Sequence, residues 1–272
     1  MRSMIDKIIS DAIKEDMPFG DATTDNLISD EDTIYGEFIA KEDGVLSGLE
    51  VAEQVFSKFK GVKISFNKKD GDTVKNKEII ATIEGKTKSI LKGERLALNI
   101  MQRMSGIATT TKKYVDIIKE YECEILDTRK TTPNLRILEK MAVVHGGGTN
   151  HRFSLSDMVM IKDNHIKAAG GIKQAVTKIK ENTTNIKVEI EVENLIQFKE
   201  ATSQDVDIIM LDNMSNEMMK DAVRLNNGKK LEASGNVNLE RLLGIAETGI
   251  DFISVGNLTH SYKSLDISLK LK

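Results

Sequence analysis

The sequence predicts an α/β protein in two parts, and three observations lead to this prediction. After residue 124, six short apolar runs alternate with stretches that have the period of a helix, a pattern typical of βαβ units and a parallel sheet. Polar residues capable of chemistry follow the carboxyl end of every run. The first third of the chain mixes helix and strand patterns instead. The length of 272 residues fits one large domain, or a medium domain with a small one.

The first third is predicted to begin with a helix over 2–15, where apolar residues recur at helical spacing. Residues 20–27 have the composition of turns and helix caps. Three strands and one further helix are predicted at 34–41, 62–66, 78–83 and 49–59, respectively. Asp70-Gly71, between the second and third strands, suits a hairpin-type turn. A long helix follows from about Glu94 toward Glu120, with a bend at Ser105-Gly106 as one option.

The remaining elements alternate between strand and helix. The predicted strands are 124–127, 158–161, 187–192, 207–211, 230–233 and 251–255, and the predicted helices are 134–144, 168–181, 194–201, 215–226 and 238–248. Pro133 suits the first turn of its helix, with Thr132 as the N-cap. Six strands are fewer than the eight of a complete barrel, so the barrel is either incomplete or has strands that the pattern does not reveal.

Composition excludes several classes of function. The chain has 39 Lys+Arg, 42 Asp+Glu, 4% aromatic residues and no Trp, which argues against a nucleic-acid partner. One cysteine, Cys123, excludes an internal disulfide and suits a reducing cytoplasm. The N-terminal run contains acidic residues and so does not resemble a secretory signal, and no apolar stretch of about 18 residues could span a membrane.

Cationic residues gather at the ends of the first two barrel strands. They are Arg129, Lys130, Arg152 and Lys162, with His151 adjacent and Arg95 on the long helix as a further candidate. A chain of net charge −3 has no general need for such a cluster, so it indicates a ligand with several negative charges. The alternative for any one of these residues is a surface cation paired with a neighbouring acid.

The other strand ends carry carboxylates and small polar residues. Glu191 and Asp212 are placed to hold Mg²⁺ together with ligand oxygens. The alternative for Glu189, Glu191 and Glu193 is a solvated strand face, which is favoured more for Glu189 and Glu193 than for Glu191. Ser234-Gly235-Asn236 and Gly256-Asn257 suit phosphate binding by backbone amides, or plain turns. No P-loop and no dinucleotide-binding glycine motif is present, so ATP hydrolysis and Rossmann-type redox chemistry lose support.

One long segment, DTRKTTPNLRILEKMAVVHGGGTNHRFSLSDMVMIKDNHI (127–166), strongly resembles the quinolinate phosphoribosyltransferase family. The resemblance continues, in order, over nearly the whole chain. It includes GDATT (20–24), ERLALNIMQRMSGIAT (94–109), VEIEVEN (188–194), IIMLDNM (208–214), LEASGN (231–236) and ISVGNLTHS (253–261). Departures are small: Asn134 stands where Gly is usual, and Ala233 and Asn236 vary the phosphate loop.

This resemblance implies an N-terminal α/β sandwich over 1–110 and an incomplete α/β barrel over 111–262, with the tail 263–272 packed on the former. It also implies reaction of quinolinate with phosphoribosyl pyrophosphate and Mg²⁺, giving nicotinate mononucleotide, pyrophosphate and CO₂. The implied catalytic residues are Lys130, Lys162, Glu191 and Asp212. The implied substrate-binding residues are Arg95, Thr128, Arg129, Lys130, His151, Arg152, Lys162, Glu191, Asp212, Ser234, Gly235, Asn236, Val255, Gly256 and Asn257.

Within this set, the family pattern places Arg129, Arg152, His151 and Lys162 against the quinolinate carboxylates, and Lys130 against the pyrophosphate. Glu191 and Asp212 would hold ribose hydroxyls and Mg²⁺, and the last two loops a phosphate. Arg95 would come from the partner subunit of a dimer, or of a higher even oligomer, with shared active sites. The chain itself supports that last point, because a helix of about 26 residues spans roughly 39 Å and would separate Arg95 from a barrel that begins at its other end.

Other functions compete with this interpretation. A relative could use a different anionic ring, such as nicotinate without decarboxylation, or could be the molybdenum-transport-associated homologue, against which the intact DTRKT and IKDNH motifs argue. A barrel lyase would use Lys130 or Lys162 as a Schiff base. A regulator on the same scaffold would bind quinolinate without releasing CO₂ or pyrophosphate.

Overall fold

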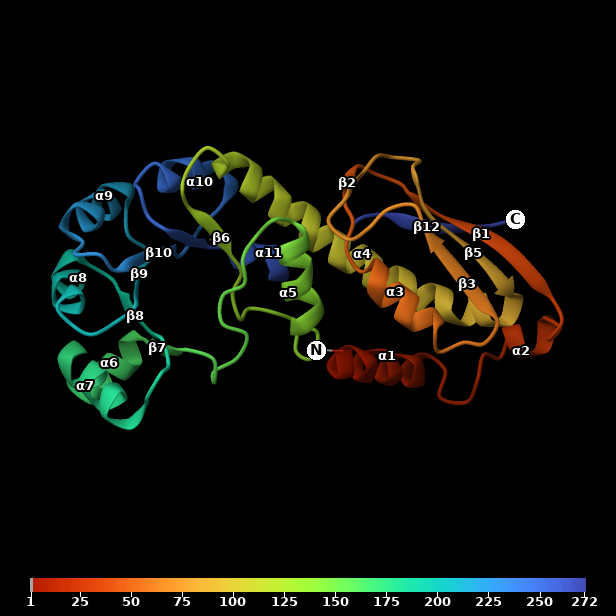
Figure 1. Cartoon of the computed structure of the whole chain (residues 1–272), viewed down its shortest axis with the longest axis horizontal. Helices are drawn as coiled ribbons and strands as arrows, with labels where there is room; N and C mark the ends of the chain where they lie inside the picture. The colour runs from red at the N-terminus through yellow and green to blue at the C-terminus, as the bar shows by residue number, and fades with distance from the viewer. Residues whose placement is uncertain (1) are drawn as a thin grey trace. The chain divides into compact units, whose positions relative to one another are not determined.

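The computed structural model describes residues 2–272, which form two compact units (Figure 1). Unit 1 combines the chain up to Lys112 with Thr131–Gly147 and Leu258–Lys272. Unit 2 consists of Lys113–Lys130 and Gly148–Asn257. These units differ from the sequence-based boundaries of 1–110 and 111–262, because a segment from the middle of the chain belongs with the N-terminal part. The α/β class itself is confirmed.

Unit 1 contains a four-stranded antiparallel sheet in the order β12-β1-β5-β3. The strands β1 (Thr33–Ala40), β3 (Val62–Phe66) and β5 (Ile79–Lys86) match the predicted ones, and β12 (Ile267–Leu271) was not predicted. Strand β12 pairs with β1, so the C-terminal tail completes the sheet begun near the N-terminus. A separate short pair joins β2 (Gly44–Val45) to β4 (Thr73–Val74).

The turn expected at Asp70-Gly71 is present, with the Asp72 N–H donating to the Lys69 carbonyl at 3.1 Å and Gly71 at φ +92°, but it does not join β3 directly to β5, because the chain between these strands makes a longer excursion. The Gly71 N–H donates to the Leu46 carbonyl at 2.8 Å, and β4 within the excursion pairs with β2. Asp70 also has a capping role: its Oδ1 accepts from the Leu49 N–H at 2.9 Å, where α3 (Leu49–Phe56) begins. A carboxylate at this position satisfies an amide that the helix leaves free.

Two further helices open unit 1, of which the first was predicted as a helix and the second lies in a segment predicted to contain turns and helix caps. Helix α1 (Arg2–Asp16) buries Ile5 and Ile9 at helical spacing. The single-turn helix α2 (Thr24–Leu27) follows the expected cap chemistry, since Asp21 Oδ1 accepts from the Thr24 N–H at 2.9 Å.

Helix α4 (Thr87–Ile118) is longer than predicted and runs without interruption through Ser105-Gly106. Gly93 does not mark its start. A Cβ there would lie 2.8 Å from the Phe56 ring. Gly93 therefore lies within α4 and lets the end of α3 pack closely against it. Gly106 has a similar role, because a Cβ would lie 2.3 Å from the Lys263 carbonyl oxygen. Both glycines therefore reflect close packing rather than a helix end or a bend.

The predicted N-cap of the next helix is also wrong. Helix α5 (Arg136–His145) begins three residues after Pro133, with Leu135 as its N-cap. Asn134 has φ +66°, a conformation that prevents the helix from beginning earlier. Glycine suits this position because it adopts positive φ without strain. Thr132 donates its N–H to Glu139 Oε2 at 3.1 Å, and Glu139 is fully buried and paired with Arg103 of α4. An acid inside the helix, rather than a cap, holds this segment.

Unit 2 contains the predicted parallel sheet of six strands, in the order β6-β11-β10-β9-β8-β7. Their bounds are β6 (Glu124–Leu126), β7 (Val159–Ile161), β8 (Val188–Val192), β9 (Ile208–Asp212), β10 (Lys230–Ser234) and β11 (Phe252–Ser254). In residues 2–272 the two edge strands, β6 and β7, are not paired with each other, so the barrel is open.

Helices follow the strands of unit 2 and lie outside them (Figure 1). The region predicted as one helix at 168–181 is two, because Gly170 and Gly171 have φ +91° and +141° and break the helical path. The helices are α6 (Asp163–Ala169), α7 (Ile172–Asn182), α8 (Leu195–Thr202), α9 (Asn216–Leu225) and α10 (Leu239–Ala246), followed by the short α11 (Asn257–His260), which is grouped mainly with unit 1. No helix within residues 2–272, the 32-residue α4 included, is both long and apolar enough to cross a bilayer.

Candidate functional site

A cavity of about 600 Å³ opens in unit 2 at the carboxyl ends of the parallel strands. Open α/β sheets and barrels place ligands at this end, where the loops after successive strands converge. Most of the predicted site residues line it: Thr128, Arg129, Lys130, His151, Arg152, Lys162, Glu191, Asp212, Ser234, Gly235 and Asn236. Four predicted residues are not among its lining residues: Arg95, Val255, Gly256 and Asn257.

The register of the sheet determines which strand residues face the cavity together. Glu191, Met210 and Glu232 are directly paired across β8, β9 and β10 and therefore form one level of the inner face. Asp212 pairs with Ser234 one level nearer the carboxyl edge. Side chains two residues apart on a strand share a face, so Glu189 lies one level below Glu191.

The cations enter this cavity from three loops. Arg129 and Lys130 follow β6, and the Lys130 N–H donates to Thr128 Oγ1 at 3.0 Å, which shapes that loop. Arg152 donates from Nη1 to the Met158 carbonyl at 3.0 Å. Burial, together with the charge of Arg129, lowers the pKa of Arg152, as expected where two guanidinium groups share a partly desolvated space. An anionic ligand would relieve this repulsion.

Lys162 stands at the end of β7 and forms an ion pair across the sheet. Its Nζ lies 2.9 Å from Glu191 Oε2, and its backbone N–H donates to His165 Nδ1 at 3.0 Å. The lysine is exposed and Glu191 is half-buried. His165 therefore holds the backbone of a site lysine.

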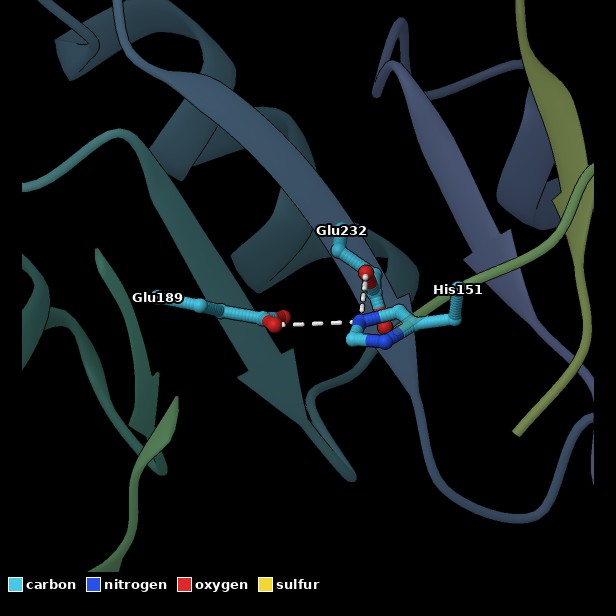
Figure 2. Close-up of side chains that lie close together, drawn as sticks. All are labelled: His151, Glu189 and Glu232. Atoms are coloured by element: carbon cyan, nitrogen blue, oxygen red, sulfur yellow. Dashed lines mark ion pairs between the residues drawn. The ribbon is translucent and has the colours of Figure 1, made fainter. Parts of the chain in front are cut away.

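At the floor of the cavity, which His151 and Glu232 both line, His151 lies between two buried glutamates from different strands (Figure 2). Its Nε2 is 3.0 Å from Glu189 Oε2 and 3.3 Å from Glu232 Oε2. Both carboxylates are 0% exposed. The interpretation of Glu189 as part of a solvated strand face is wrong, because the open barrel turns this face of β8 inward; Glu193, beyond the end of the strand, is exposed.

Charge and burial compete in this group. Burial disfavours the imidazolium, but Glu189 and Glu232 outweigh it and raise the pKa of His151 to about 10. Burial and the neighbouring Glu232 raise the pKa of Glu189 to about 7, against the opposing effect of His151. Against this shift, His151 Nδ1 accepts the Arg152 N–H at 2.7 Å, which only a neutral imidazole can do, so the geometry assigns the neutral ring with its proton on Nε2, between the carboxylates.

Several cavity residues were not predicted. They are Asp127, Met160, Met210, Asn213, Glu232 and Ser254. Asp127 is fully buried and its Oδ1 accepts the His151 N–H at 2.9 Å. Its position at the end of β6 was a usable signal. Glu232 gave a weaker one, as a charged residue inside an otherwise apolar strand.

The loop after β10 has a backbone conformation that favours glycine and asparagine. Gly235 has φ +93°, and a Cβ there would lie 2.2 Å from Asn213 Oδ1. Asn213 and Asn236 also have positive φ values, of 53° and 50°, and the Asn236 side-chain amide donates to Asn213 Oδ1 at 3.0 Å. The two loops after β9 and β10 are thus locked together, with small and amide side chains at the cavity edge.

The carboxylates at the cavity edge fit a Mg²⁺ ion held mainly by its ligand. Glu191 and Asp212 lie on neighbouring strands and both line the cavity. One Glu191 oxygen pairs with Lys162, and Asp212 Oδ2 accepts from the Asn213 amide at 2.9 Å. Each residue therefore has one further carboxylate oxygen, which matches an ion that takes few protein ligands and completes its shell with phosphate oxygens and water.

Comparison with family models covers almost the whole chain. Residues 21–105 match the model described as quinolinate phosphoribosyl transferase, N-terminal domain. Residues 107–270 match the model of the C-terminal domain of the same description.

Individual relatives agree with the family models. A protein from Bacillus subtilis described as a probable nicotinate-nucleotide pyrophosphorylase (carboxylating) is 42% identical, over 97% of this chain and 92% of its own length. A quinolinate phosphoribosyltransferase (decarboxylating) 1b from Nicotiana tabacum is 43% identical, over 97% of this chain and 81% of its own. The solved structure of the nicotinate-nucleotide pyrophosphorylase from Francisella tularensis superposes with a TM-score of 0.96 at 39% identity, covering 100% of this chain and 97% of that one.

Proposed function

Because the chain belongs to the quinolinate phosphoribosyltransferase family, we propose that it transfers the phosphoribosyl group of phosphoribosyl pyrophosphate to quinolinate in de novo NAD biosynthesis. The products are nicotinate mononucleotide, pyrophosphate and CO₂. The observation that carries this proposal is the convergence of Arg129, Lys130, Arg152 and Lys162 on one cavity at the carboxyl ends of the strands. Two substrates rich in negative charge require such a cluster.

The reaction balances without a redox cofactor. The bond from the anomeric carbon to the pyrophosphate oxygen breaks, and the pyridine nitrogen forms a bond to that carbon. The ring is then a pyridinium. Loss of the 2-carboxylate as CO₂ leaves its electron pair on the ring carbon, where a proton from solvent replaces it. Stabilising the departing pyrophosphate matters more here than a protein nucleophile.

Residue roles follow from charge and position. Arg129, Arg152 and Lys162 bind the quinolinate carboxylates, and Lys130 faces the departing pyrophosphate. The loop with Ser234, Gly235 and Asn236 receives a phosphate, an assignment supported by its positive φ values and the absence of bulky side chains. The family pattern alone supports a substrate-binding role for four further residues, Thr128, Val255, Gly256 and Asn257. For His151, protein atoms already contact both ring nitrogens, which leaves the ring without a free nitrogen for the quinolinate carboxylates.

Glu191 and Asp212 would hold the ribose hydroxyls and Mg²⁺, which neutralises charge on the pyrophosphate when bound. Asp212→Asn is expected to lower turnover strongly and to raise the Mg²⁺ concentration needed for half-maximal rate. The amide keeps the shape of the side chain but loses the charge that attracts the ion. Initial rates over a Mg²⁺ titration measure this, and an unchanged Mg²⁺ dependence would show that the carboxylate has only a structural role.

We further propose a homodimer, or a higher even oligomer, in which Arg95 of one subunit completes the cavity of another. Arg95 is an exposed residue of unit 1 and is not among the residues that line the cavity in unit 2. We therefore assign the arginine at that cavity to a second subunit. A cytoplasmic location agrees with a chain whose one cysteine, Cys123, needs no oxidising compartment.

A single assay tests the proposed function. Purified protein with phosphoribosyl pyrophosphate, Mg²⁺ and carboxyl-labelled quinolinate is expected to release pyrophosphate and CO₂ in equal amounts. Pyrophosphate release with nicotinate and no CO₂ would indicate a different anionic ring. Quinolinate binding with neither product would indicate a regulator. Borohydride trapping of a carbonyl substrate on Lys130 or Lys162 would indicate a lyase.

A further inference from the structure

The buried group of His151, Glu189 and Glu232 (Figure 2) has no ligand-binding role in the proposed function, yet two of its members, His151 and Glu232, line the cavity. Three strands hold it in place. Glu189 comes from β8, Glu232 from β10, and Ser254 of β11 donates from Oγ to Glu232 Oε1 at 2.6 Å. The carboxylates are thus oriented by the sheet itself, whereas His151 lies on the loop that follows the three glycines at 146–148.

Two buried carboxylates are unfavourable at this position for two reasons. Removing them from water costs free energy that one histidine repays only in part. Their negative charge also opposes the binding of an anion in the cavity above. A group that destabilises the fold and repels an anionic ligand is expected to have a function that offsets both effects. Its contacts show which residues it holds in place.

The constrained residues are His151 and Arg152. The two carboxylates meet the ring at Nε2 from different strands, which prevents rotation of the imidazole. The opposite ring nitrogen, Nδ1, accepts the Arg152 N–H at 2.7 Å, and Asp127 accepts the His151 N–H at 2.9 Å. The backbone that carries Arg152 is therefore tied to β8 and β10 through the ring, and to the end of β6 through Asp127.

We propose that Glu189 and Glu232 are positioning residues for quinolinate, which act by locking the His151 ring so that its Nδ1 holds the backbone of Arg152 and directs that guanidinium into the quinolinate subsite. This inference rests on the proposed function and extends it to two residues outside the ligand-contacting set. Small displacements of a binding group are expensive, and a shift of about 1 Å can cost about 100-fold in rate.

Whether quinolinate affinity falls or rises in Glu189 variants distinguishes a positioning role from a purely electrostatic effect. Glu189→Leu removes both the charge and the oxygen that faces Nε2, whereas Glu189→Gln removes the charge and keeps an oxygen in a side chain of the same shape. If the carboxylate only adds negative charge, both variants bind quinolinate more tightly. If it positions the ring, Glu189→Leu weakens quinolinate binding by about 10- to 100-fold and Glu189→Gln recovers most of the loss. The same pair of changes at Glu232 is expected to behave alike.

The measurements are the KM values for both substrates, kcat, and the Kd of quinolinate by calorimetry. The KM for phosphoribosyl pyrophosphate is expected to change less than about 2-fold, because Glu191 is held by Lys162 and Ser234 by the sheet, neither of them through the His151 ring. Glu193→Gln is the matched control, a neutralised glutamate just beyond the same strand that is exposed. Unchanged or tighter quinolinate binding in the Leu variants would overturn the proposal.

A second readout covers the case in which a Leu variant fails to fold. The chain has four histidines, so the ring nitrogens of His151 can be followed by ¹⁵N NMR in wild-type protein and in Ser254→Ala, which removes one hydrogen bond to Glu232. A protonated Nε2 and an accepting Nδ1 are expected in the wild type, with a weakened preference in the variant. An Nδ1–H tautomer in the wild type would contradict the proposed orientation.

Two other outcomes are distinguishable. The donor atoms of the three residues all lie within 4.8 Å of one another, so a tightly held metal ion, found by elemental analysis in wild type and lost in Glu189→Gln, would replace positioning by metal binding. Failure of the wild type to release CO₂ and pyrophosphate would overturn the proposed function. Normal wild-type turnover with unaffected variants would overturn only the positioning role.

Discussion

Arg152→Ala is expected to weaken quinolinate binding by about 30-fold or more, and to change binding of phosphoribosyl pyrophosphate far less. Loss of one charged, hydrogen-bonded partner in a desolvated site costs roughly 2–5 kcal/mol. Arg152 is half-buried, and its lowered pKa reflects that desolvation and the nearby Arg129 charge. Calorimetric titration of each substrate, with the protein otherwise intact, measures the two affinities separately.

Arg224→Ala is a suitable control for this change. Arg224 is an exposed residue of α9 that pairs with Asp221 three positions earlier in the same helix, and it does not line the cavity. Its removal is expected to alter neither affinity. Equal losses for both substrates in Arg152→Ala would contradict the assignment of this residue to the quinolinate subsite and would indicate a general disturbance of the cavity.

Mixing Arg95→Ala protein with Lys162→Ala protein is expected to restore activity that each variant lacks alone. If Arg95 acts across a two-fold dimer, each subunit both donates and receives one arginine. A heterodimer of the two variants then contains one site with both residues and one site with neither. Random exchange of equal amounts makes half of the dimers mixed, so recovery is expected to approach about one quarter of wild-type activity.

Subunit exchange has to be demonstrated in the same samples, for example by fluorescence transfer between differently labelled subunits. Loss of activity in Lys162→Ala is expected to be large, because this change also leaves Glu191 without its 2.9 Å partner. Full activity of the Arg95→Ala protein by itself, or no recovery despite exchange, would reject a shared site. Recovery would also establish the oligomer without reference to any relative.

Most strands of the fold could be predicted, because each has a local signal. The six runs of unit 2 are short, apolar and bounded by polar residues, and all six were located to within a few residues. Glycines were harder to interpret. Gly170 and Gly171 break a helix, whereas Gly93 and Gly106 lie within one. The difference is set by neighbours distant in sequence, Phe56 and Lys263, which no local pattern contains.

Most residues of the cavity could be predicted once the strands were located. Residues that follow strand ends, such as Arg129, Lys162 and Asp212, converge because the carboxyl ends of parallel strands share one edge. Val255, Gly256 and Asn257 also follow a strand but are not among the lining residues. Position after a strand is therefore not sufficient, since the course of each loop decides which residues turn inward.

The sequence by itself determined the α/β class, the parallel sheet, the family and the charge of the site, since these depend on periodicity, residue type and order along the chain. Tertiary structure alone decided the burial and ion pairing of residues whose neighbours come from other elements. Glu189 and Glu193 look equivalent in an alternating run of glutamates, yet one is fully buried against His151 and the other is exposed. The physical reason is that burial and ion pairing depend on how strands pack into a barrel, which the alternation of one strand does not specify.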